Sequence, residues 1–254
     1  MPPETTPMMQ QYLRMKELHP DCILFFRLGD FYEMFNEDAK LVSKELELTL
    51  TSRDRGKPEA QRTPMCGVPY HSADAYIARL IAKGYKVAIC EQMEDPKKAK
   101  GLVKREIIRR VTPGTVVEAS MLDENRNNFL GCVYAAGGSV GVCFADITTG
   151  SVYATGSDNW NDITSEFGRF APREVLVGGG AISADSLQSF LKERLEALIE
   201  PMPEECFEAQ RSAERIQEHF KVQDFDAVGL TDLPCTVRCL GGLLDYLEQT
   251  QKAS

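Results

Sequence analysis

Residues 22–35 read Cys-Ile-Leu-Phe-Phe-Arg-Leu-Gly-Asp-Phe-Tyr-Glu-Met-Phe, and the first half of the chain is organised around them. The apolar run 22–28 predicts a buried strand that ends at Gly29-Asp30. Upstream, Thr6-Pro7 has the form of an N-cap followed by proline at the first helical position, which predicts a helix to about Leu18. Residues 29–35 therefore lie at a strand exit, where they place aromatic rings and a carboxylate close together.

Two interpretations of this exit remain open. An apolar ring such as Phe31 can wedge between base pairs and kink a duplex, at roughly a few kcal/mol per unstacked step, and a mispaired step costs less to open. Phosphates repel a carboxylate, so Glu33 belongs beside DNA only if it reads a base edge. Alternatively, Phe31 and Phe35, spaced i and i+4, seat a helix on a core.

The charge is divided unevenly along the 254 residues. The net charge is −9; residues 1–115 contain 19 Lys+Arg and 16 Asp+Glu, a balance of +3, which leaves 10 against 22, or −12, for residues 116–254. The first half can approach a phosphate backbone, and the second is suited to a protein partner or is an ordinary acidic surface. Seven cations lie within residues 97–110, among them Lys104, Arg105 and Arg109. They form either a phosphate-binding cluster or a solvated charge run.

The eight cysteines are scattered, several within apolar runs, and we interpret them as reduced core thiols of a cytoplasmic protein. Neither a signal peptide nor an apolar run near the ~20 residues of a membrane span is present. Cys235 and Cys239 are spaced to share one helix face, but zinc requires four ligands and no second Cys/His pair has ligand spacing. No metal site is expected.

The pattern predicts an α/β protein with two domains. The first covers 1–115, as a mixed α/β unit with helices near 34–46 and 72–84, strands near 48–51 and 85–90, and a basic loop at 52–64 that contains Arg53. A linker at 116–127 precedes a second domain, 128–254. The order of elements in this second domain favours an RNase H-like layered fold. Three hairpin strands are predicted near 129–135, 140–147 and 151–154, followed by a helix at 159–170, a strand at 174–177 and helices near 184–195, 208–220 and 236–249.

Catalytic chemistry has weak support. Asp146 ends a central strand, where an RNase H-like nuclease holds a metal-binding carboxylate, but two-metal catalysis requires several converging acids. Asp30, Glu33, Glu91 and Glu94 lie near strand ends of the first half without clear metal-binding spacing. No P-loop sequence is present. A metal-dependent nuclease and a protein-interaction scaffold remain the alternatives to DNA recognition, and we predict no catalytic residue.

Several blocks together resemble the N-terminal part of the MutS family of DNA mismatch repair proteins, in its bacterial form. The matching stretches are Gln-Gln-Tyr-Leu at 10–13, Gly-Asp-Phe-Tyr-Glu-Met-Phe at 29–35, Gly-Val-Pro-Tyr-His at 67–71, Ala-Ile-Cys-Glu-Gln at 88–92 and Val-Thr-Pro-Gly-Thr at 111–115. The second half matches more diffusely, through Ala-Asp-Ile-Thr-Thr-Gly at 145–150 and its strand order, and is similar to the family's connector domain.

The resemblance implies roles for individual residues. The family's Phe-x-Glu motif falls on Phe31, which would stack on the mispaired base, and on Glu33, which would hydrogen-bond it. Arg53 and Arg105 fall in stretches that hold backbone-contacting arginines, and with Lys104 and Arg109 they are the predicted phosphate contacts. Tyr32 and Phe35 are assigned to packing.

The resemblance also implies an assembly. Domain I would read mismatched double-stranded DNA, and the acidic connector domain would signal to a MutL-type protein. The ATPase, clamp and lever domains, with their ATP and Mg, would lie beyond Ser254. The chain would then be a monomeric, nucleoid-associated fragment of a homodimeric protein, with no enzyme activity or cofactor of its own.

Overall fold

The computed structural model describes residues 6–53, 56, 58, 61–96, 99, 101–118, 121–122 and 127–251. The chain divides into two compact units, one ending at Thr112 and the other running from Pro113 to Thr250. The division falls slightly before the predicted domain end at 115, because the Gly114 amide donates a 2.8 Å hydrogen bond to the buried Glu174 carboxylate of the second unit. Part of the predicted linker, 119–120 and 123–126, lies outside the described residues.

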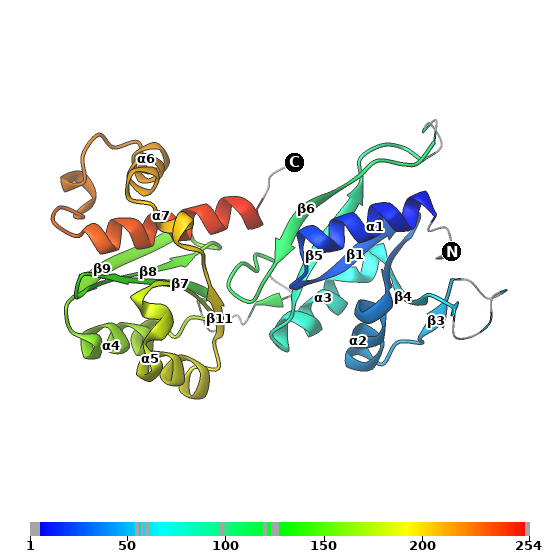
Figure 1. Ribbon diagram of the computed structural model, residues 1–254, viewed down its shortest axis with the longest axis horizontal. Helices are drawn as coiled ribbons and strands as arrows, with labels where there is room; N and C mark the ends of the chain where they lie inside the picture. Colours follow the sequence, from blue (N-terminus) through cyan, green and yellow to red (C-terminus); the bar gives the residue numbers. More distant parts are fainter. Residues whose placement is uncertain are drawn as a thin grey trace. The chain divides into compact units, whose positions relative to one another are not determined.

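The first unit contains a six-stranded sheet in the order β3-β4-β2-β1-β5-β6 (Figure 1). Its strands are β1 (Cys22–Leu28), β2 (Phe31–Phe35), β3 (Thr51–Ser52), β4 (Pro64–Pro69), β5 (Lys86–Gln92) and β6 (Arg105–Val111). Strand β1 pairs antiparallel with β2 and parallel with β5. Its helices are α1 (Pro7–Leu18), α2 (Asn36–Leu46) and α3 (Ala73–Ala82), the last preceded by the 3-10 turn η2 (Tyr70–Ser72).

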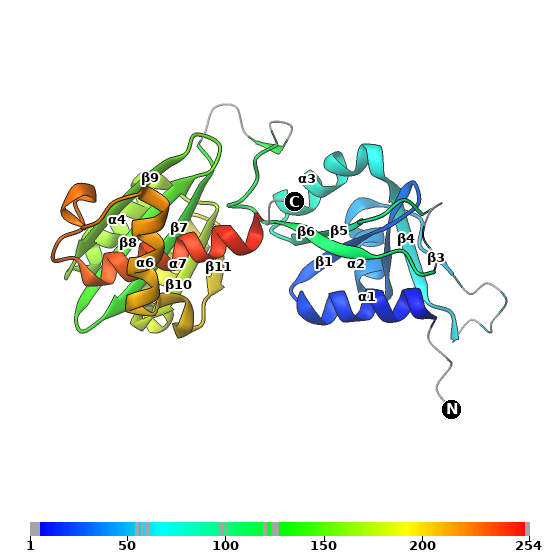
Figure 2. The same cartoon turned by 90° about the horizontal axis from the view of Figure 1, so that it is seen from above.

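Helix α1 covers one face of this sheet, and α2 and α3 cover the other (Figures 1 and 2). The predicted N-cap is confirmed, since the Thr6 hydroxyl accepts a hydrogen bond from the Met9 amide and Pro7 opens the helix. Tyr12 of α1 packs edge-on against Phe26 and Phe35 in a core that includes Leu24 and Cys90. This core joins α1 to the sheet, and Phe31 is not part of it.

The chain reverses at Gly29-Asp30, so residues 31–35 form a strand where the sequence predicted a strand exit and, from residue 34, the start of a helix. The expected helix at 34–46 is wrong at its start, because residues 34 and 35 belong to β2 and the chain turns at Asn36, the first residue of α2, which has a φ of 54°. The strand expected at 48–51 is reduced to β3. Strands β4 and β6 were not predicted, since prolines bound β4 and charges interrupt the apolar pattern of β6.

The second unit contains a five-stranded sheet in the order β11-β10-β7-β8-β9. Its strands are β7 (Phe129–Ala136), β8 (Ser139–Asp146), β9 (Ser151–Ser157), β10 (Glu174–Gly179) and β11 (Leu198–Pro201). Strands β7 to β9 form an antiparallel meander, while β10 and β11 run parallel to β7. The sheet agrees with the predicted RNase H-like layered fold, and β11 is the strand that the sequence pattern did not show.

Helices cover both faces of this second sheet (Figure 1). They are α4 (Trp160–Phe170), α5 (Asp185–Ser189) with the π-helical turn η5 (Phe190–Arg194), α6 (Ala209–Phe220) and α7 (Pro234–Thr250), with 3-10 turns η4 (Gly180–Ser183), η6 (Glu204–Phe207) and η7 (Asp226–Val228). Helices α6 and α7 pack on one face, and α4 and α5 on the other. No helix among the described residues is long and apolar enough to cross a membrane.

Helix α7 approaches the sheet most closely at Gly141 of β8. A Cβ there would lie 2.4 Å from the carbonyl carbon of Cys235 and from the Thr236 amide nitrogen, both backbone atoms that cannot rotate away. We therefore expect Gly141→Ala to lower the free energy of unfolding by about 3 kcal/mol, measured by urea unfolding of the protein. Gly168→Ala is the matched control in the same unit, because its Cβ would meet only Phe190 at 3.7 Å. An unchanged stability of Gly141→Ala would contradict this packing.

Candidate nucleic-acid interface

The pairing of the first sheet brings the candidate DNA-binding residues to one end. Phe31, the first residue of β2, lies opposite Leu28 of β1 and Pro69 of β4. On the far side of β1, Gln92 at the end of β5 lies opposite Arg105 at the start of β6. Phe31 and Arg105 are 74 residues apart in the sequence, yet both lie at the same end of the sheet. The sequence alone did not show this convergence.

Phe31 is the exposed residue of the aromatic cluster. Its side chain is 45% exposed, whereas Tyr32 is 8% and Phe35 0% exposed. The turn that presents it requires a left-handed residue, and Gly29 provides one with φ 58°. The helix-seating interpretation of Phe31 is therefore wrong, because residues 31 and 35 lie on a strand and only Phe35 enters the core. The assignment of Tyr32 and Phe35 to packing is confirmed.

A polar network on the opposite face holds this turn. The Arg27 guanidinium lies 3.3 Å from the Glu91 carboxylate and 3.7 Å from the centre of the Tyr70 ring, and its Nε donates to the Gly29 carbonyl. The Tyr32 hydroxyl donates to the same Glu91 carboxylate, and burial together with Glu91 raises the pKa of Tyr32. The network was missed at the sequence level, because only the pairing of β2, β1 and β5 places these side chains in one row.

Glu33 shares the sheet face of Phe31, since residues two apart on a strand point to the same side. Its side chain is 22% exposed, and Oε2 is buried without a hydrogen bond. Arg53 approaches this oxygen at 3.7 Å, which is an ion pair at long range. Burial raises the pKa of Glu33, and the nearby Arg53 charge opposes part of that rise. The carboxyl group therefore has a buried oxygen that accepts no hydrogen bond in the protein.

A glycine makes room beside Glu33. Gly67 of β4 pairs with Glu33, and a Cβ at residue 67 would lie 3.5 Å from Cγ of Glu33 and 3.2 Å from the Tyr32 carbonyl oxygen. A side chain at residue 67 would therefore press on the Tyr32 carbonyl oxygen and fill the space beside the Glu33 side chain.

The four predicted phosphate contacts differ in their surroundings. Lys104 is the most accessible, with 68% of its side chain exposed and an ion pair to Glu106 at 2.6 Å. Arg53 is 41% exposed, and Arg109 is half-buried on β6. Lys97, Lys98 and Lys100 of the basic stretch lie outside the described residues. Lys104 adjoins the strand-end edge, Arg53 follows β3 at the other end of β2, and Arg109 lies four residues inside β6. Exposed cations such as Lys104 and Arg53 are suited to phosphates without reading sequence.

Arg105 is placed differently from the expectation for a backbone contact. It is 6% exposed, and its guanidinium donates to the Arg27 carbonyl at 2.8 Å, to Gln11 at 2.9 Å and to the Val103 carbonyl at 3.0 Å. The group also lies over the Phe26 ring at 4.9 Å. In this conformation Arg105 joins α1, β1 and β6, and most of its donors are occupied within the domain.

The carboxylates of the nuclease alternative do not converge. Among the described residues, the group that could hold a metal consists of three cysteines, and Asp30, Glu33, Glu91 and Glu94 form no such group. Asp146 accepts hydrogen bonds from the amide and hydroxyl of Thr148, at 2.9 and 2.6 Å, so its carboxylate caps its own turn. This agrees with its interpretation as a strand-end cap.

Family models match both units of the chain. The model of MutS domain I matches residues 6–120, and that of MutS domain II matches residues 128–254. The chain belongs to the MutS family. Curated relatives named "DNA mismatch repair protein MutS" include those of Acetivibrio thermocellus, 49% identical over 254 residues, and Methanococcoides burtonii, 43% identical over 249 residues. They cover 98% and 97% of this chain.

The chain spans 28% of the length of each of these MutS relatives. The domain I match extends past Thr112 into the first residues of the second unit, but each match falls mainly on one unit, so the Phe31 edge lies in MutS domain I and the acidic unit corresponds mainly to MutS domain II.

The raised pKa of Glu33 has a consequence for stability. Ionised Glu33 costs folding free energy at pH values above its folded pKa, and this cost disappears as the pH falls through that pKa. We expect Glu33→Gln to be more stable than the wild type at pH 7.5, by at most the roughly 1–3 kcal/mol of an unsatisfied buried acceptor. The difference should vanish near pH 4 in urea unfolding.

The control is Glu37→Gln, whose carboxylate is 85% exposed and ion-paired with Lys40 at 2.7 Å. It should not gain stability at pH 7.5. If the Glu33→Gln variant is less stable than the wild type at that pH, the inference that ionised Glu33 destabilises the folded protein is wrong.

Proposed function

We propose that this protein recognises mispaired positions in double-stranded DNA, with Phe31 as the wedge and Glu33 as the base-contacting group. The observation that carries the proposal is a half-exposed ring at a rigid hairpin turn, beside a carboxyl group whose buried oxygen has no hydrogen bond. Both side chains project from the same face of β2. This arrangement is suited to a base step that opens easily.

The energetics of the wedge favour a mismatch. Inserting a ring costs roughly a few kcal/mol per unstacked step, and a mispaired base has already lost part of its stacking and pairing energy. The ring regains stacking of about 1–3 kcal/mol per base. Phe31 can therefore distinguish paired from mispaired steps without reading a particular base, while the polar network under its turn keeps the tip from collapsing onto the sheet.

Glu33 reaches a base acceptor only as a neutral acid. A carboxylate and a purine ring nitrogen are both acceptors, so a hydrogen bond between them requires a proton on the carboxyl group. Burial already raises the pKa of Glu33, and nearby phosphates would raise it further. Arg53 acts in the opposite direction, and its attraction to a phosphate would draw it away from Glu33 and remove that opposition.

Lys104, Arg53 and Arg109 would neutralise phosphates around the edge, and Arg105 would position β6 rather than contact the backbone itself. Neutralising a few phosphates gives salt-dependent affinity without sequence preference. The balance of +3 over residues 1–115 is small. The two domains alone should therefore bind weakly, and the assays below use the full MutS polypeptide that contains this sequence.

We expect Phe31→Ala to abolish mismatch selectivity, because the stacking that favours an open step is lost. Glu33→Gln should retain or strengthen mismatch binding, since the side-chain amide already carries the hydrogen that it donates, whereas the carboxylate must first be protonated. The measurement is the ratio of equilibrium affinities for mismatched and matched duplexes at a fixed salt concentration. If Glu33→Gln loses selectivity as fully as Phe31→Ala, neutral-acid recognition by Glu33 is wrong.

Two control variants distinguish insertion of Phe31 from phosphate binding. Lys104→Gln should weaken matched and mismatched duplexes alike and reduce the salt slope by about one. Tyr153→Ala removes an equally exposed aromatic ring, 46% exposed, from domain II and should leave selectivity unchanged.

The second domain is suited to a protein partner. A groove of ≈ 680 Å³ lies between α6, the 224–233 segment and α7, with Ala213, Phe225, Leu233 and Val237 among its apolar lining. Three carboxylates, Asp224, Asp226 and Asp232, line it as well. Residues 116–254 carry a balance of −12. We propose that a MutL-type protein docks here through a segment that combines apolar and basic side chains.

The acidic rim predicts a charge-dependent interaction. Replacing Asp226 and Asp232 together by Asn should weaken capture of the cognate MutL-type protein about tenfold, with reduced salt dependence, as measured by surface plasmon resonance. The matched control replaces Asp185 and Glu193, exposed carboxylates of the opposite helical layer, by Asn and Gln. If both pairs weaken binding equally, the groove is not the docking site.

A further inference from the structure

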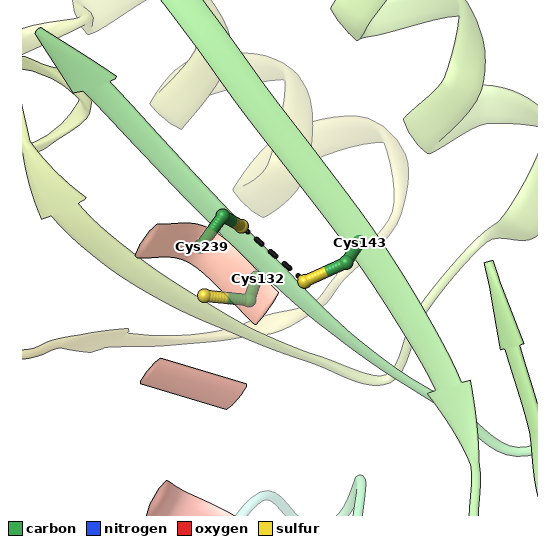
Figure 3. Close-up of side chains that lie close together, drawn as sticks. All are labelled: Cys132, Cys143 and Cys239. Atoms are coloured by element: carbon green, nitrogen blue, oxygen red, sulfur yellow. Dashed lines mark hydrogen bonds between the residues drawn. The ribbon is translucent and has the colours of Figure 1, made fainter. Parts of the chain in front are cut away.

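Three thiols meet in the interior of the second unit. Cys132 of β7 and Cys143 of β8 are paired neighbours across the two strands, and Cys239 projects onto them from α7 (Figure 3). The three sulfur atoms all lie within 4.8 Å of one another, and those of Cys143 and Cys239 are 3.3 Å apart. Each side chain is 0% exposed. Cys235, one turn earlier on α7, points elsewhere and contacts the Ala136 carbonyl.

The spacing is suited to one central atom. A centre bonded to three sulfurs at about 2.3 Å holds them about 4 Å apart when the arrangement is planar, and closer together when it is pyramidal. The 3.3 Å between the Cys143 and Cys239 sulfurs falls in this range, and the Cys132 sulfur lies within 4.8 Å of both. The three residues come from three different elements, so their positions are fixed by the packing of α7 on the sheet.

The surroundings restrict the charge of the occupant. The trio is enclosed by apolar residues such as Leu176, Leu240 and Leu243. The groups that shift the pKa values of these thiols are the thiols themselves and the Val133 backbone, with no cation among them. A divalent ion on three thiolates would leave one uncompensated negative charge, and a monovalent ion two, which is costly in a dry core. Zinc would also lack a fourth ligand.

We propose that Cys132, Cys143 and Cys239 form a binding site for trivalent arsenic, taken up from arsenous acid. In this reaction three As–O bonds break and three As–S bonds form. Each hydroxide leaves with one thiol proton as water, so three waters are released and arsenic remains in the trivalent state. The product is neutral and buries no charge.

The thiols differ in reactivity. Burial raises the pKa of Cys143 and Cys239 well above the ordinary value, so both retain their protons. Although burial opposes it, hydrogen bonds from Cys143 and Cys239 lower the pKa of Cys132, so Cys132 loses its proton more readily than the other two thiols. Because the trio is enclosed, arsenite enters when α7 separates locally from β7 and β8, and the capture rate should become independent of arsenite concentration once this opening limits it.

The test uses the reduced protein with sodium arsenite. Native mass spectrometry should show one arsenic gained and three hydrogens lost per chain, and X-ray absorption should show three sulfur and no oxygen neighbours. Hydrogen exchange of the α7 amides should slow on binding, since three bonds would tie this helix to the sheet. Absence of an adduct in the wild type, or arsenic with an oxygen neighbour, would overturn the proposal.

Variants localise the site. Cys239→Ala and Cys143→Ala should each lose the three-sulfur adduct, whereas Cys235→Ala, on the same helix, should retain it. The wild-type absorption spectrum decides the coordination even if a core variant fails to fold. A three-sulfur adduct that persists in folded Cys239→Ala would place the arsenic elsewhere and refute the assignment.

Discussion

The reversal of the chain at Gly29-Asp30 is the constraint on which the first unit depends. Because Gly29 adopts a left-handed conformation, β2 returns antiparallel to β1, and Phe31 is left at the tip while Phe35 enters the core. Two further contacts fix the turn: Arg27 donates to the Gly29 carbonyl, and the Tyr70 amide donates to the Asp30 carbonyl. The exposed Phe31 ring therefore stands on a turn that is hydrogen-bonded on both sides.

The two faces of this sheet divide the polar chemistry. On one face, Arg27, Tyr32 and Glu91 satisfy one another and make the hairpin rigid. On the other, Glu33 keeps a buried oxygen without a hydrogen bond, with Arg53 only at long range. This burial raises the pKa of Glu33 and is unfavourable for its ionised form, and perturbed pKa values of this kind are common at functional sites.

The second unit is organised by the close approach of α7 to its sheet. Gly141 permits backbone contact with residues 235 and 236, and this proximity brings Cys239 onto Cys132 and Cys143. The same packing anchors the start of the unit, because Glu174 accepts hydrogen bonds from the Gly114 amide and the Tyr246 hydroxyl. The core of this domain is therefore polar at a few defined points and apolar around them. The interpretation of the cysteines as core thiols is confirmed, since all eight are unpaired and all but the half-buried Cys206 are buried.

Local patterns determined much of the architecture. The apolar run of β1, the capped helix α1 and the Gly-bounded meander of the second unit follow from hydrophobic period and turn residues, and the ordered blocks of residues 10–115 identified the family. Tertiary structure decided the rest. The i and i+4 spacing of Phe31 and Phe35 also fits a helix, and only the pairing of β2 with β1 and β4 shows that these residues form a strand. Arg105 carries the same charge as Lys104, yet the strand register buries Arg105 and exposes Lys104. The three thiols lie 11 and 96 residues apart along the chain, so no sequence spacing could show that they meet. Side-chain burial and strand pairing depend on contacts between segments that are distant in the sequence, whereas a sequence pattern reports only relations between neighbouring residues.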